Sequence, residues 1–280
     1  MANDTLIKKI AFRLVKKHIA GFTTESALNA VRSVNMRGMH ATITFLNEHT
    51  GDQIKARYNS NTYMQILKQI SRLHLNADLS IRLSQLGYGV GEEYAKQNLS
   101  EILNAAEKSK KFIWIENEEG IQAARIYSEL KRDYDCIGLE TQITNNSLRR
   151  DYNVKIKYHL EEMLSKDGKK VSSALREYAH ELSHLTNRVE SVTVFEKNPK
   201  IISKLLNLHL GKRNLIFELP LGYENKVAKN NSQVKNMSVY VPYGKDWVPY
   251  IISNIAKGRL KRVATALFDG EDRRGYKNAS

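Results

Sequence analysis

The sequence of 280 residues lacks the features that mark secreted and membrane-spanning proteins. Its single cysteine, Cys136, cannot form an internal disulfide, which fits a reducing compartment. No run of about eighteen apolar residues occurs, and the N-terminus has no apolar block followed by a cleavage site. We therefore expect a cytoplasmic protein.

Several signatures of nucleotide-binding and hydrolytic proteins are also missing. No strand-like run is followed by Gly-x-Gly-x-x-Gly or by a P-loop, which argues against a Rossmann-type site. There is no Gly-x-Ser-x-Gly elbow of a serine hydrolase and no zinc-finger, RRM or KH pattern. The chain is nevertheless basic, with Lys+Arg 44 against Asp+Glu 30 and a net charge of +14. Contact with nucleic acid or an anionic membrane therefore stays open, and a solvated basic surface is the simpler interpretation.

Strand-like and helix-like segments alternate along most of the chain. Strand-like runs occupy residues 41–46, 79–83, 111–116, 137–143, 154–158, 192–195, 215–219 and 237–240. Helical spacing marks residues 63–73, 92–107, 120–132, 172–189 and 199–208. Eight strands alternating with helices in a chain of this length favour a (β/α)8 TIM-type barrel over a doubly wound sheet.

Two further helices are expected before the first strand. Residues 5–20 form a basic amphipathic pattern that suits a helix covering the core or one lying on an anionic membrane, and residues 24–36 form a second helical segment. The predicted organisation is therefore N-terminal helices at 1–38, the barrel at 39–268 and a flexible basic tail at 269–280.

Residues 240–250, YVPYGKDWVPY, concentrate aromatic and rigid residues. Pro242 and Gly244 predict the end of a strand, because proline gives no N–H to a ladder and glycine permits a sharp reversal. Asp246 is placed to cap a helix whose first turn accepts Pro249. A strand, a tight loop and a helix thus meet where barrels carry their active sites.

The predicted carboxyl ends of the strands carry a ring of polar and charged residues. A polar ligand, anionic or zwitterionic, would suit such a ring. The residues are Arg82, Ser84, Gln85, Glu116, Glu118, Glu119, Gln142, Asn145, Lys155, Lys157, Glu196, Lys197, Glu218, Tyr240 and Tyr243.

Several motifs together resemble the proline dehydrogenase family of FAD-dependent (β/α)8 barrels. LSIRLSQLG is similar to the family's second strand, IWIENEE to its third, VKIKY to its fifth and IFELPLGY to its seventh. The segment YVPYGKDWVPY, which leads into the eighth helix, is the most similar. The resemblance implies hydride transfer from C5 of proline to FAD, with electrons passing on to a quinone or another acceptor.

The resemblance also implies roles for individual residues. Arg82 stands where the family has a lysine near the substrate, and Glu116 where it has an aspartate. Lys155 takes the place of the arginine that addresses the flavin, or Lys157 if the register slips. The residues that match the family's cofactor-binding and substrate-lining types are Gln142, Glu218, Tyr240 and Tyr250.

Other positions depart from the family pattern. Ser253 and Asn254 replace the paired arginines that clamp the proline carboxylate, and Lys257, one turn further on, is the candidate substitute. Glu196 and Lys197 stand within the altered strand-six signature, and Tyr158 replaces a glycine. The strand-six and Tyr158 changes fall on the expected flavin wall.

Two alternatives remain beside the flavoenzyme, which would oxidise proline or a proline-like imino acid. In one, the barrel has lost catalysis and binds nucleic acid or another polyanion. In the other, His180-Glu181-Leu182-Ser183-His184 is the H-E-x-x-H motif of a zinc hydrolase. A barrel would place this motif on an outer helix with both imidazoles towards solvent, so a surface histidine pair is the simpler interpretation.

Overall fold

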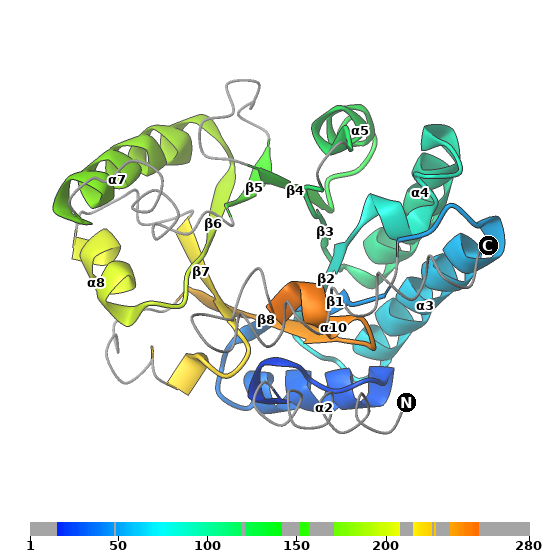
Figure 1. Ribbon diagram of the computed structural model, residues 1–280, viewed down its shortest axis with the longest axis horizontal. Coiled ribbons are helices and arrows are strands. Elements are labelled where there is room, and N and C mark those ends of the chain that lie inside the picture. The colour runs from blue at the N-terminus through cyan, green and yellow to red at the C-terminus, as the bar shows by residue number, and fades with distance from the viewer. Residues whose placement is uncertain are drawn as a thin grey trace, which may run out of the picture.

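Eight parallel strands close into a barrel that is surrounded by helices (Figure 1). The computed structural model describes residues 16–47, 49–118, 121–141, 152–156, 171–207, 215–225, 227 and 236–251. Each strand pairs with the next one in the chain, and the first closes the barrel against the last. The strands are β1 (His40–Phe45), β2 (Ala77–Ile81), β3 (Ile113–Ile115), β4 (Ile137–Thr141), β5 (Asn153–Ile156), β6 (Ser191–Phe195), β7 (Leu215–Pro220) and β8 (Met237–Tyr243). The predicted (β/α)8 barrel is confirmed.

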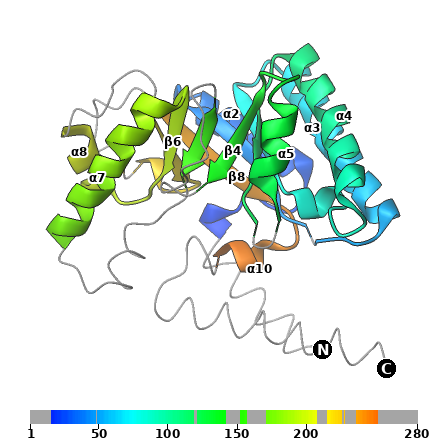
Figure 2. The ribbon, with the colours of Figure 1, turned by 90° about the horizontal axis from the view of Figure 1, so that it is seen from above.

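The longer helices form the outer layer (Figures 1 and 2). They are α2 (Thr24–Asn35), α3 (Gln53–Arg72), α4 (Glu92–Ser109), α5 (Ala123–Leu130), α7 (Val171–Arg188) and α8 (Pro199–Asn207). Short turns are η1 (Lys16–His18), η2 (Leu83–Leu86) and α10 (Trp247–Tyr250). Buried residues recur every three or four positions, as at Tyr63, Ile66, Leu67 and Ile70 of α3. Each helix therefore packs an apolar stripe onto the strands.

The two faces of the strands differ in chemistry. Ile43, Leu79 and Val154 belong to the apolar core shared with the helices. The alternate residues Thr44 and Lys155 point into the barrel, where they are buried and bonded to polar partners. Aliphatic side chains usually fill such a barrel. The interior of this barrel instead carries hydroxyls and paired charges, so it can form a polar site.

The helix expected at residues 63–73 in fact begins at Gln53. Asp52 caps it by accepting a hydrogen bond from the backbone N–H of Lys55 at 2.9 Å. Polar residues on the inner face interrupt the apolar pattern over the first turns. Asn59, for example, is buried and donates to the carbonyl of Gln85 at 3.0 Å. The spacing of apolar residues therefore predicted a start for α3 that is too far along the chain.

Strand β8 continues through Pro242 to Tyr243, so the prediction that it ends at Tyr240 was wrong. The carbonyl of Pro242 accepts a hydrogen bond from Ala20, on the side away from β1. Because the nitrogen and carbonyl of one strand residue face the same side, the missing N–H of Pro242 removes no bond to β1. Gly244 makes the turn with φ of 130°. Asp246 stands at the N-cap of α10 but its side chain makes no capping hydrogen bond.

The segments before and after the barrel are described only in part. Helix α2 packs on β1 and β8. Of residues 5–20, the structure describes 16–20, with a short 3-10 turn at Lys16–His18. The division at residues 38 and 268 stays a prediction, since 252–280 lie outside the described residues. Within the described part, no helix is both long and apolar enough to span a bilayer.

Candidate functional site

A buried carboxylate, Glu116, lies at the centre of a polar network at the carboxyl end of the barrel. Its Oε1 accepts hydrogen bonds from the hydroxyls of Thr44 at 3.1 Å, Ser80 at 2.8 Å and Tyr240 at 2.5 Å. Its Oε2 lies 2.9 Å from Nε of Arg82. Four strands, β1, β2, β3 and β8, thus supply or precede groups that meet at one carboxylate. Such a fully bonded acceptor is fixed in position.

Arg82 remains a cation at this site. Burial opposes its charge, but the adjacent Glu116 carboxylate outweighs that effect, and the pKa of the guanidinium is raised. The side chains of the pair are 17% and 5% exposed, so little solvent screens them. Removing one partner of such a pair leaves an uncompensated buried charge. Arg82 and Glu116, predicted separately from two strand ends, therefore form one unit.

Aromatic rings line the same end of the barrel. Tyr240 stacks on Tyr250 of α10 with ring centroids 5.8 Å apart, and Phe195 meets Tyr240 edge-on at 5.7 Å. Burial and the nearby Glu116 raise the pKa of Tyr240 well above its usual value. Its hydroxyl therefore stays protonated at neutral pH and donates to the carboxylate. Figure 2 shows α10 lying across this end of the barrel.

A second ion pair lies inside the barrel. The Lys155 amine is 2.9 Å from both oxygens of Glu218, and neither side chain is more than 1% exposed. The amine also lies 4.8 Å from the ring centroid of Trp114 and 5.7 Å from that of Tyr240. Lys155 and Glu218 are thus brought together, and their charges offset each other.

Glu196 does not present its carboxylate as an unpaired charge. It is 5% exposed, and its Oε1 accepts the backbone N–H groups of Lys197 and Asn198, each at 2.8 Å. The carboxylate therefore fastens the turn between β6 and α8. Two amide dipoles therefore face its charge.

Several predicted site residues lie outside the described residues. They are Glu119, Gln142, Asn145, Lys157, Ser253, Asn254 and Lys257. The structure therefore tests neither the replacement of the paired arginines nor the alternative strand-five register, and both stay predictions.

Sequence reasoning missed several members of the site. Thr44 and Ser80 bond Glu116, and Trp114 faces the Lys155 amine. Their signal was the two-residue alternation, which puts them on the inner face of their strands. His49 was also missed, and its Nδ1 lies 3.4 Å from Oε1 of Glu118, which was predicted at a strand end. That hydrogen-bonding carboxylate raises the pKa of His49.

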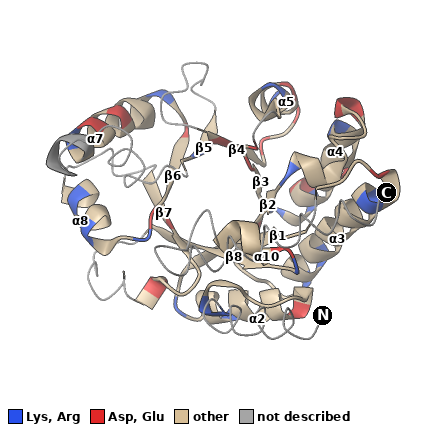
Figure 3. Cartoon of the chain, viewed as in Figure 1, with Lys and Arg blue, Asp and Glu red and all other residues tan. Residues whose placement is uncertain are grey.

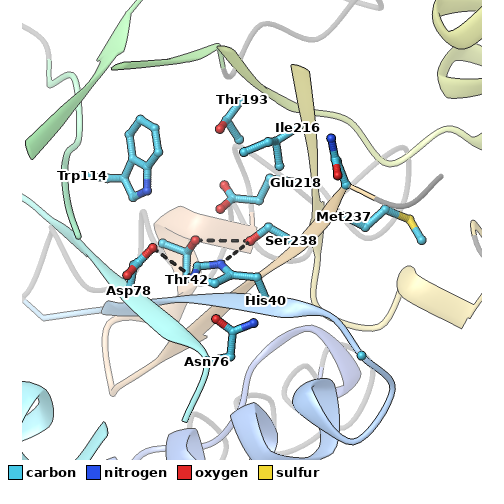
Figure 4. A pocket seen from close by; sticks show the side chains of 12 residues that line it. His40, Thr42, Asn76, Asp78, Trp114, Thr193, Ile216, Glu218, Met237 and Ser238 are labelled. Atoms are coloured by element: carbon cyan, nitrogen blue, oxygen red, sulfur yellow. Dashed lines mark hydrogen bonds and ion pairs between the residues drawn. The ribbon is translucent and has the colours of Figure 1, made fainter. Parts of the chain in front are cut away.

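A cavity of about 540 Å³ opens at the opposite, amino end of the strands (Figure 4). His40 links two of its walls: Nε2 lies 3.0 Å from Asp78 and Nδ1 lies 3.3 Å from the Ser238 hydroxyl. Trp114 and Glu218 close its inner end. Barrel enzymes carry catalysis at the carboxyl end, so Glu116 and its partners, rather than this cavity, form the candidate site.

The histidines of the H-E-x-x-H motif lie on the outer face of α7. His180 and His184 are exposed, while Leu182 and Leu185 are buried against the barrel. Among the described residues, no group of three or more His, Cys, Asp or Glu is arranged to hold a metal. The position predicted from the barrel is confirmed, and nothing supports a zinc hydrolase.

The chemistry of the carboxyl end fits a flavin in type. A flat ring system needs aromatic or apolar groups and nearby donors, and Tyr240, Tyr250 and Lys155 are of these types, although all three side chains are buried in this structure. A pyrophosphate needs cations and backbone N–H groups, and Lys197 and Lys200 lie where β6 gives way to α8. Figure 3 shows basic residues elsewhere interspersed with acidic ones on the outer helices.

The chain is similar to several proline dehydrogenases along most of its length. It is 25% identical to proline dehydrogenase 1 of Bacillus subtilis strain 168 over 270 residues, covering 90% of this chain and 88% of the relative. Proline dehydrogenase 2 of that strain is 25% identical over 278 residues, with 89% and 88% covered. The enzyme of Deinococcus radiodurans is 21% identical over 276 residues, with 91% and 89% covered. No protein-family model matches the chain.

Solved structures of proline utilization A share the fold. The protein from Bdellovibrio bacteriovorus, inactivated by N-propargylglycine, superposes with a TM-score of 0.71 at 14% identity, covering 92% of this chain and 33% of the other. The protein from Corynebacterium freiburgense gives 0.64 at 14% identity, with 94% and 34% covered. This chain thus spans about a third of those longer proteins. The chain is thus similar to proline dehydrogenases over nearly its whole length, and it shares the barrel fold of proline utilization A.

Proposed function

We propose that this protein is a flavin-dependent oxidoreductase that oxidises proline or a proline-like imino acid. The observation that carries the proposal is the network around Glu116, in which Arg82 and Tyr240 meet at the carboxyl end of the barrel. The sequence likeness to proline dehydrogenases over about nine tenths of the chain supports the reaction class.

Arg82 is the residue we assign to the substrate carboxylate. A guanidinium carries five N–H donors, and Glu116 takes the one on Nε. The remaining donors suit a carboxylate, which binds arginine through paired hydrogen bonds. This assignment gives the anion a partner although Ser253 and Asn254 stand where the family has arginines.

The stacked Tyr240 and Tyr250 rings would pack against the apolar ring of the substrate. Their planes differ by 21°, so one buried ring stacks on the other. Glu116 holds the Tyr240 hydroxyl at 2.5 Å and so fixes the orientation of that ring. Positioning of this kind is what turns binding into a rate advantage.

The flavin-binding residues we propose are Lys155, Glu218, Glu196 and Lys197, with Gln142 and Lys157 from the segments outside the described residues. FAD, when bound, would supply the two-electron oxidation at C5 of proline and pass electrons to a quinone or another acceptor. The Lys155 amine is held by Glu218 and by two aromatic rings, so it offers a fixed positive charge beside the ring system.

An anaerobic spectrum of the purified chain reconstituted with FAD tests the proposal. We expect the visible flavin bands to bleach when L-proline is added and to return when a quinone analogue is supplied. Arg82→Ala should raise the proline KM by about 100-fold, because a charge-assisted pair is lost. Arg125→Ala, which removes an exposed arginine from α5, is the matched control and should leave KM unchanged. A chain that takes up no FAD, or whose bound flavin is not reduced by proline or its analogues, would refute the proposal.

A further inference from the structure

Two histidines on the outer face of α7 have no part in the proposed reaction. His180 and His184 are four residues apart, so their side chains lie one above the other on the helix surface. The opposite face of α7 is fixed, because Tyr178, Leu182 and Leu185 are buried against the barrel. The two imidazoles are therefore exposed groups on a backbone that is held in place.

Their geometry matches that of two ligands sharing one metal ion. The Nε2 atoms of His180 and His184 are 3.2 Å apart. Bonds of about 2.0–2.1 Å from imidazole nitrogen to a metal place two nitrogens about 3.3 Å apart at a tetrahedral ion. At the right angles of a square or octahedral ion the same bonds give about 2.9 Å. The observed separation of 3.2 Å falls between these values, and the two ring planes are inclined by 75° to each other.

We propose that His180 and His184 bind one divalent transition-metal ion through their Nε2 atoms. Imidazole suits copper, nickel and zinc, and we expect Cu²⁺ to bind more tightly than either Ni²⁺ or Zn²⁺. Mg²⁺ and Ca²⁺ should not bind, because they prefer oxygen ligands. Water completes the coordination. The site binds metal without hydrolysing a substrate, because the described residues supply no third ligand and no closed pocket around it.

The charges around the pair are balanced. Arg176 and Arg188 lie four residues before and after the histidines, and Glu177 and Glu181 lie on the same side of α7. Two cations therefore face two carboxylates, and the long arginine side chains have room to turn towards solvent. The competing explanation for the short separation is a direct hydrogen bond between neutral imidazoles, which the experiment must distinguish from metal binding.

Calorimetric titration of the untagged, chelator-treated full chain with NiCl₂ and ZnCl₂ provides the test. We expect one ion per chain at this site and a rise in unfolding temperature with excess metal, because the ion binds the folded helix. His184→Gln should weaken the affinity by about 100-fold, since the second ligand makes the binding intramolecular.

The matched control keeps two histidines but separates them. His184→Gln combined with Asn187→His places the imidazoles seven residues, about 10 Å, apart along the helix, too far to share an ion. It should bind as weakly as His184→Gln alone. His74→Asn, which removes an exposed lone histidine, should bind like the wild type. Equal affinity in the wild type and the separated pair would overturn the proposal and leave the hydrogen bond as the explanation. Flavin content and proline oxidation should be the same in all these variants.

Discussion

The two ends of this barrel hold charged networks of similar composition in different surroundings. At the carboxyl end, Glu116 and Arg82 are nearly closed off from solvent. At the amino end, the side chains of His40 and Asp78 are 29% and 20% exposed beside an open cavity. Solvent screens the second pair and not the first. The comparison shows that the carboxyl end is built to hold one arrangement, whereas the amino end tolerates change.

Matched isosteric substitutions should separate the two ends most clearly. Glu116→Gln removes the charge that Arg82 faces and should lower the free energy of unfolding by about 3–5 kcal/mol. Asp78→Asn keeps the oxygen that accepts the Phe112 N–H and should cost no more than about 1 kcal/mol. Urea unfolding of both variants measures the difference. Equal losses would mean that the two ends are alike in stability, and the comparison would fail.

The ion pair of Lys155 and Glu218, inside the barrel, adds a third and fully buried case to this comparison. Lys155→Met leaves Glu218 as an unpaired buried carboxylate and should cost about 3 kcal/mol. Adding Glu218→Leu removes that charge and should restore stability to within about 1 kcal/mol of the wild type. The double variant should still bind FAD more weakly, which equilibrium dialysis would show. If the two losses simply added, the side chains would not be coupled.

Much of the architecture could be predicted from the sequence because strand and helix periods differ. All eight strands lie close to their expected positions, since apolar residues on their outer faces repeat every second position. The start of α3 was misplaced because Asn59 and Ser60 are buried through hydrogen bonds, which hydropathy does not register. The end of β8 was misplaced because tolerance of Pro242 depends on which neighbour its nitrogen faces.

The site could be predicted only in part, for a similar reason. The positions of Arg82 and Glu116 followed from the strand ends and from the resemblance, but their pairing depends on the spacing between neighbouring strands. The partnership of Lys155 with Glu218 joins β5 and β7, which are not adjacent in the sheet. Contacts across a closed barrel depend on its curvature and side-chain length, and no local pattern encodes them.

The turn after β8 shows that backbone geometry also constrains the carboxyl end. Gly244 has φ of 130°, and a Cβ there would overlap the carbonyl oxygen of Leu46. Gly244→Ala should therefore cost about 2–3 kcal/mol and displace Tyr250 from Tyr240. Gly91→Ala, where a Cβ meets nothing within 4 Å, is the control and should be near neutral. Thermal unfolding and the KM for proline would report both effects.

The smallest expected effect concerns two histidines at the carboxyl end whose pKa values move in opposite directions. The Glu118 carboxylate raises the pKa of His49, so its contribution to stability is complete below about pH 6.5 and is lost as pH rises through the folded pKa. Burial lowers the pKa of His18. In its neutral form, the Nδ1–H of His18 donates a hydrogen bond to the carbonyl oxygen of Leu221 at 2.7 Å. Its contribution is complete above about pH 6.5 and is lost as pH falls.

These opposite signs make the two histidines separable in one experiment. The stability advantage of the wild type over His49→Gln should shrink between about pH 5 and pH 8, whereas its advantage over His18→Gln should grow. Urea unfolding across that range measures both slopes. The His49 effect should be the weaker, because its side chain is 67% exposed and solvent screens its pairing with Glu118. If the two slopes had the same sign, the surroundings of His18 and His49 would not be distinct electrostatic environments.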